Sequence, residues 1–133
     1  IPLMTPEGLI VLPSSCPPKD AMDRLAASVV RRGMTVFARI DHAAAAKDVG
    51  MTLDPTEVLI FGNPKGGTPV MQAAQTMGID LPLKALVWQD DTGKTWIGYN
   101  DPRWLARRHG VSGHDQQLDG MSNALAAVTR EAC

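Results

Sequence analysis

The sequence of 133 residues is poor in aromatic residues, has only two cysteines and carries almost no net charge. Phe, Trp and Tyr make up 5% of it, and 13 basic residues nearly balance 14 acidic ones, for a net charge of -1. A protein held on nucleic acid by a general basic surface has a clear positive excess. The charge balance therefore argues against this class, and we expect no nucleic-acid partner.

The sequence also lacks a long apolar run. Nothing in it approaches the ~20 residues that a transmembrane helix needs, so we expect no membrane span. No signal peptide is recognisable. The chain begins with Ile1 rather than Met, which agrees with a periplasmic form whose signal has been removed and equally with a trimmed cytoplasmic chain. The compartment stays open.

Metal-binding spacings are missing as well. Cys16 and Cys133 belong to no CxxC or Cys/His pattern, and His109 and His114 form no HxxxH or HExxH motif. We therefore expect no metal site, and the sequence leaves any cofactor undetermined. Two unpaired thiols are the interpretation we favour for the cysteines, although a disulfide in an oxidising compartment stays open.

The apolar share of 44% is enough for a single domain with a core. The last two strands form a hairpin over 84–99 with no helix between them, which indicates an α+β domain with a mainly antiparallel sheet and helices on one side. The strand at 34–40 alternates, with Phe37 and Arg39 on one face. Four successive apolar residues at 57–62 predict a central strand covered on both faces. Strands are predicted at 8–15, 34–40, 57–62, 84–89 and 94–99, and helices at 19–32, 42–49, 69–77, 102–109 and 115–131.

The segment 61–70, FGNPKGGTPV, joins an apolar strand to a helix through two glycines. Strand, glycine-rich loop and helix start are also the parts of a phosphate-binding loop. A Walker A loop is excluded, because Lys65 precedes the glycines and because Pro64 and Pro69 remove two N–H donors. A nucleotide site is therefore not expected here.

A weaker anion site at this segment remains open. We expect Thr68 to cap a helix whose first residue is Pro69. The N–H groups of Gly66, Gly67 and Thr68 would then point at an anion, and Lys65 would add a positive charge. The same residues also suit an ordinary strand-to-helix turn.

A second candidate feature is the pair Asp41–His42, where a strand gives way to a short helix. Asp41 is a suitable N-cap for that helix. His42 on the first turn could serve as a general base, a proton carrier or a ligand. A structural histidine is the simpler alternative, because the sequence identifies no partner for its ring.

Four stretches together carry a family resemblance. They are DHAAxA, FGNPxxGTPxMQ, DLPLxxLVW and YNDPxxLAxRH, within residues 9–110. In these marks the chain resembles the family called domain of unknown function 302 (DUF302). The resemblance implies a small α+β domain with a curved antiparallel sheet, often a homodimer, and it implies no particular activity. Residues 111–133 lie outside the resemblance and are expected to form a C-terminal helical extension.

Three functions stay open, and whether the protein is an enzyme is undecided. The leading hypothesis is a pocket for a small anionic ligand between residues 62–68 and 41–42, in a homodimer. The second is an enzyme that uses His42 as acid or base, with Cys16 in redox chemistry. The third is a structural or protein-interaction domain whose terminal helix contacts the partner. The candidate ligand-binding residues are Asp41, His42, Asn63, Lys65, Gly66, Gly67, Thr68, Tyr99 and Asn100.

Overall fold

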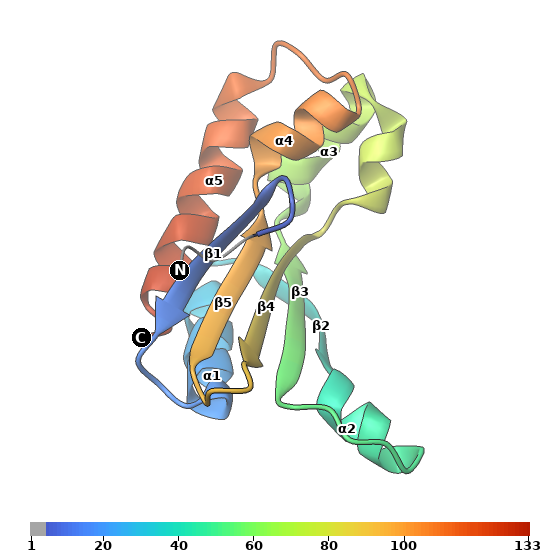
Figure 1. The fold of residues 1–133 in the computed structure, drawn as a ribbon. Helices are drawn as coiled ribbons and strands as arrows, with labels where there is room; N and C mark the ends of the chain where they lie inside the picture. The colour runs from blue at the N-terminus through green and yellow to red at the C-terminus, as the bar shows by residue number, and fades with distance from the viewer. Residues whose placement is uncertain (1–4) are drawn as a thin grey trace.

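The computed structural model describes residues 5–133, which form one five-stranded sheet beside a set of helices (Figure 1). The strand order is β1-β5-β4-β3-β2, and every neighbouring pair is antiparallel. The predicted α+β class is confirmed. The strands are β1 (Leu9–Ser14), β2 (Thr35–Asp41), β3 (Thr56–Gly62), β4 (Leu83–Gln89) and β5 (Thr95–Asn100), and the helices are α1 (Pro18–Arg31), α2 (His42–Asp48), α3 (Pro64–Ala73), the 3-10 helix η1 (Gln75–Ile79), α4 (Pro102–Arg108) and α5 (Asp115–Arg130).

Helices α1 and α5 lie against one face of the sheet, and this face carries the core (Figure 1). Leu59 and Phe61 of β3 and Ile97 of β5 point into it and are fully buried. Met22 and Leu25 of α1 are buried on the facing side, at the spacing of one helix stripe. Burial of these side chains is the main favourable contribution to folding.

No helix of residues 5–133 covers the opposite face of the sheet, which we call the open face. The prediction that β3 is covered on both faces is therefore wrong. Val58 and Ile60 lie on the open face and keep partial exposure. A hairpin, rather than a helix, connects β4 to β5, so this connection supplies no covering layer. Strand register places six apolar residues on this face, beside the polar Thr56 and Lys84: Ala38, Ile40, Val58, Ile60, Leu86 and Trp88.

The predicted hairpin is confirmed, and Asp90 organises its turn. The Oδ1 atom of Asp90 accepts hydrogen bonds from the N–H groups of Thr92 (2.9 Å) and Lys94 (3.0 Å). Its Oδ2 atom accepts one from the indole N–H of Trp96 (2.8 Å). The Thr92 hydroxyl also donates to Asp90 and has the largest effect on its pKa. Together these bonds hold the pKa of Asp90 well below its usual range. Gly93 has the positive φ (87°) that the turn requires.

The C-terminal helix α5 belongs to the same core as the rest of the domain. Leu118, Leu125 and Val128 on its apolar stripe are buried against the sheet side of the molecule. The segment predicted as a C-terminal helical extension thus contains a helix that packs into the domain core, and this stripe is not available to a partner. Its apolar spacing suits an interior face as well as an interaction surface, and the sequence could not tell these apart.

A disulfide joins Cys16 to Cys133, with the two Cα atoms 5.7 Å apart. The favoured interpretation of two unpaired thiols is thus wrong, because folding brings the end of α5 beside the loop after β1. The same junction has backbone bonds. The N–H of Ser15 donates to the carbonyl of Cys133 (3.0 Å), and the Ser14 hydroxyl donates to the carbonyl of Ala132 (3.1 Å).

Glu131 ties the end of α5 to the end of α1. Its Oε2 atom accepts from the Ser28 hydroxyl (2.5 Å) and from the Arg31 guanidinium (2.8 Å), and its Oε1 atom contacts Arg32. The bond from Ser28, followed by those from the two arginines, lowers the pKa of Glu131 to about 2. The carboxylate therefore stays charged over the whole physiological range.

Candidate functional site

A groove of about 850 Å³ opens between the end of β3, helix α3 and helix α5. Its walls come from three parts of the sequence, within 32–37, 62–83 and 116–124, and four amide side chains supply most of its polar groups. Thr68 also lines it, and among residues 5–133 Arg32 is the only charged residue of the lining. The apolar residues are Met34, Phe37, Met71, Leu81, Leu83 and Met121, and the amides are Asn63, Gln116, Gln117 and Asn123.

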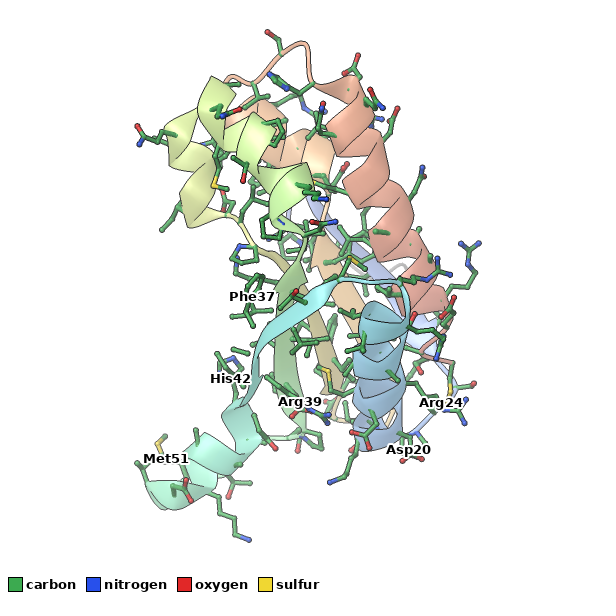
Figure 2. The ribbon with its side chains drawn as sticks, turned by 180° about the vertical axis from the view of Figure 1, so that it is seen from behind. Asp20, Arg24, Phe37, Arg39, His42 and Met51 are labelled. Atoms are coloured by element: carbon green, nitrogen blue, oxygen red, sulfur yellow. A yellow bond between two sulfur atoms is a disulfide. The ribbon has the colours of Figure 1, made fainter. Side chains whose placement is uncertain are left out.

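Phe37 reaches the groove because β2 contains a bulge. Val36 pairs with Phe61 of β3 and Ala38 pairs with Ile60, so Phe37 is the extra residue. Figure 2 shows Phe37 and Arg39 on opposite sides of β2, where simple alternation predicts one face. Arg39 binds Asp23 of α1 and Glu57 of β3, each at 2.8 Å.

Helix α3 begins at Pro64, five residues before the start predicted at Pro69. Asn63 is its N-cap and accepts a hydrogen bond from the N–H of Lys65 (3.0 Å). The N–H groups of Gly66 and Gly67 donate to the carbonyl of Asn63 at 2.9 and 3.1 Å. The donors expected to hold an anion are therefore already used, because an asparagine and a proline outcompete Thr68 as a helix start.

The other predicted half of the pocket lies elsewhere. Thr35 pairs with Gly62 at one end of the β2–β3 ladder, and Asp41 pairs with Glu57 at the other. Six residues of strand separate these ends by roughly 20 Å. The pocket predicted between residues 62–68 and 41–42 therefore does not form, since antiparallel pairing places them at opposite ends.

The structure places Asp41 and His42 at the start of α2. Asp41 caps α2 by accepting from the N–H of Ala44 (2.9 Å), as predicted, and it lines a second cavity of about 540 Å³. His42 is exposed and has no hydrogen-bond partner among residues 5–133 (Figure 2). The geometry thus gives His42 no group that would orient or activate its ring.

Three further candidates lie outside both cavities. Lys65 is exposed on the first turn of α3 and does not line the groove. Tyr99 is buried on the core face of β5, where burial raises the pKa of its phenol. Asn100 ends the same strand, two strands from β3 and therefore about 10 Å from it. Of the predicted residues, the structure brings together Asn63, Gly66, Gly67 and Thr68 in the groove.

The sequence analysis missed the contribution of α5 to this groove. Gln116, Gly120 and Asn123 follow one another at i, i+4 and i+7 and so share a helix face. A glycine on that face leaves room for a ligand, and a Cβ atom at Gly120 would meet no atom within 4 Å. The sequence signal for this wall of the groove was a stripe of polar and small residues on α5, opposite its stripe of buried apolar residues. Only the packing of α5 shows that it faces α3.

Comparison with known proteins settles the family. The sequence profile described as "Domain of unknown function DUF302" matches residues 10–128, almost the whole chain. The chain belongs to the DUF302 family. A DUF302 protein of known structure, described as an uncharacterized conserved protein from Bacillus stearothermophilus, superimposes with a TM-score of 0.84 at 21% identity, covering 96% of this chain and 100% of that one. The DUF302 match extends into α5, in agreement with the shared core.

The curated relatives of this DUF302 chain carry a different name. "Fluoride-specific ion channel FluC 1" of Brucella suis biovar 1 (strain 1330) is 44% identical over 126 residues, and so is the protein of that name from Brucella abortus biovar 1 (strain 9-941). The match covers 94% of this chain but only 50% and 47% of these relatives. The chain thus spans about half the length of the curated relatives it matches.

Within residues 5–133, no helix combines the length and the apolar character that crossing a membrane requires. The same residues contain no group of three or more His, Cys, Asp or Glu side chains placed to hold a metal ion.

Proposed function

We propose that this DUF302 domain is a small-ligand-binding module and that the groove beside α3 and α5 is its site. One observation carries the proposal, namely a cavity of about 850 Å³ that combines apolar walls with converging amides. Ligand sites in proteins are clefts of about 300–1,000 Å³, mostly apolar, with a few polar groups that orient the ligand. The groove has this size and this lining.

The lining indicates a ligand with an apolar body and one polar or anionic group. Met34, Met71 and Met121 are flexible side chains that adapt to irregular apolar shapes. Arg32 is the only formal charge on the groove, and it shares that charge with Glu131. A carboxylate on the ligand would approach Arg32 and the amides, rather than the first turn of α3. We therefore favour amphipathic organic carboxylates over small inorganic anions.

Replacing Gly120 by Phe should fill the groove and weaken ligand binding at least about tenfold, a loss of about 1.4 kcal/mol. Gly120 has open space around its missing Cβ, so the fold should tolerate the ring. Gly120→Ala is the matched control, since a methyl group leaves most of the groove free and favours the helix by roughly 1 kcal/mol. A thermal-shift screen of amphipathic carboxylates, followed by calorimetric titration, measures the effect. Equal affinities in the wild type and Gly120→Phe would contradict this site.

The names of the curated relatives suggest a second role. Because proteins named fluoride-specific ion channels contain a region similar to this whole domain, we propose that such a domain works beside a fluoride channel as its ligand-responsive part. The same screen therefore includes fluoride, with chloride at equal ionic strength. A shift with fluoride alone would favour fluoride itself as the ligand, and a shift with carboxylates alone would favour a separate regulatory ligand.

We also propose that two copies of the domain associate through the open face. Among its apolar residues Ile40 is 41% exposed, and in the segment after α2, which follows β2 in the chain, Val49 and Met51 are 73% and 68% exposed. Apolar surface concentrated in this way marks contact sites. Ile60→Lys should therefore shift a dimer to a monomer in light scattering, while Lys65→Ala, on a different surface, should not. A monomeric wild-type protein at micromolar concentration would refute the association.

A further inference from the structure

Three side chains outside the groove form a hydrogen-bonded chain that the sequence gave no reason to expect. The hydroxyl of Thr76 in η1 lies 2.8 Å from Nδ1 of His109, which caps the end of α4. Nε2 of His109 lies 2.5 Å from Oδ2 of Asp80, just after η1. A hydroxyl, an imidazole and a carboxylate in this order are the parts of a nucleophilic catalytic triad.

The partners of Asp80 determine the tautomer of His109. Arg108 donates to both oxygens of Asp80, at 3.1 and 2.9 Å, and so pairs the carboxylate with a guanidinium. An ionised carboxylate only accepts hydrogen bonds, so the neutral imidazole donates its Nε2–H to Asp80. Its Nδ1 lone pair then faces Thr76, whose hydroxyl donates to it. The ring is thus set to take a proton from Thr76.

The base and the nucleophile differ in their exposure to solvent. The side chain of His109 is only 8% exposed, which protects its two hydrogen bonds from competing water. Thr76 is exposed at the surface, so a substrate can reach its oxygen. Ile79, about one 3-10 turn after Thr76 in the same short helix, is 73% exposed and offers an apolar contact for an acyl group. A buried base beside an exposed hydroxyl suits acyl transfer, because the base keeps its orientation while a substrate reaches the hydroxyl.

We propose that Thr76, His109 and Asp80 form an acyl-transfer site for small activated acyl esters. Oγ1 of Thr76 attacks the ester carbonyl carbon while its proton passes to Nδ1 of His109, and Asp80 stabilises the resulting imidazolium. The bond to the leaving alkoxide breaks, and that oxygen takes the proton from Nδ1. Water then gives a proton to Nδ1 and attacks the acyl carbon, releasing the carboxylic acid and returning the proton to Thr76.

The test uses the whole protein with 4-nitrophenyl acetate. Peptide mass spectrometry after brief exposure should find one acetyl group on Thr76 and none on Thr52, an exposed threonine without a histidine partner. Thr76→Val should abolish that modification and lower 4-nitrophenol release about 100-fold, the scale of general-base assistance. Thr76→Ser should restore both. Asp80→Asn should lower the rate of 4-nitrophenol release although Thr76 is still present, because the substitution favours the wrong tautomer of His109.

Circular dichroism separates a catalytic from a structural role, since Thr76→Val is nearly isosteric and should leave the fold unchanged. An unmodified Thr76 in the wild-type protein would overturn the proposal. So would a release rate that is the same in the wild type and in a folded Thr76→Val variant.

Discussion

Reduction of the Cys16–Cys133 disulfide is expected to lower the free energy of unfolding by about 2–4 kcal/mol, the usual range for such a bond. The two cysteines are 117 residues apart, so the cross-link closes nearly the whole chain into one loop. A loop this long strongly restricts the unfolded chain, which is the main source of the stabilisation in the chain-entropy account. The folded state should survive at room temperature, because Ser15 and Ser14 also bind the last two residues.

Urea unfolding with and without a reductant measures this effect. The double variant Cys16→Ser with Cys133→Ser is the control, and its unfolding midpoint should match the reduced protein and ignore the reductant. A midpoint that stays constant after complete reduction of the wild type, verified by thiol titration, would show that the disulfide adds nothing. Destabilisation on reduction would also indicate that the domain is most stable in an oxidising compartment.

Replacing Phe61 by Ala should destabilise the domain by about 3–5 kcal/mol, the scale for an aromatic side chain removed from a core. Phe61 is fully buried on the helix-facing side of β3, so its loss leaves a cavity that α1 and the neighbouring strands cannot fill. This is a large fraction of the about 5–15 kcal/mol that stabilises a typical domain.

Phe37→Ala is the matched control, since it removes the same side chain from a neighbouring strand. Phe37 is 52% exposed beside the groove, so its loss should cost under about 1 kcal/mol. The same substitution should instead weaken ligand binding. Denaturant unfolding and ligand titration of both variants compare the two effects. Equal losses of stability would mean that the two strand faces do not differ as the structure indicates.

The elements of the fold could largely be predicted from local patterns. The cap at Asp41 and the hairpin over 84–99 depend on residues close in sequence, and the structure has them where they were predicted. The start of α3 was misplaced because two overlapping cap signals, at Asn63 and Thr68, differ little in local chemistry. Asn63, followed directly by Pro64, is the cap that the structure uses.

The candidate site was less accessible to sequence reasoning. Its residues come from β2, from the start of α3, from the segment before β4 and from α5, and no motif connects them. The bulge at Phe37 depends on how β2 pairs with β3, and the pattern of β2 alone predicts the other face. The triad of Thr76, Asp80 and His109 joins residues up to 33 positions apart, so their spacing carries no signature.

By itself the sequence determined the α+β class, the order of the strands and helices, and the family, because periodicity, caps and motifs are local properties. Only the tertiary structure decided which predicted residues meet. Antiparallel pairing separated Asp41 and His42 from the loop at 62–68, and the packing of α5 built the groove and brought Cys133 to Cys16. Such contacts depend on long-range burial and register, which no short stretch of sequence encodes.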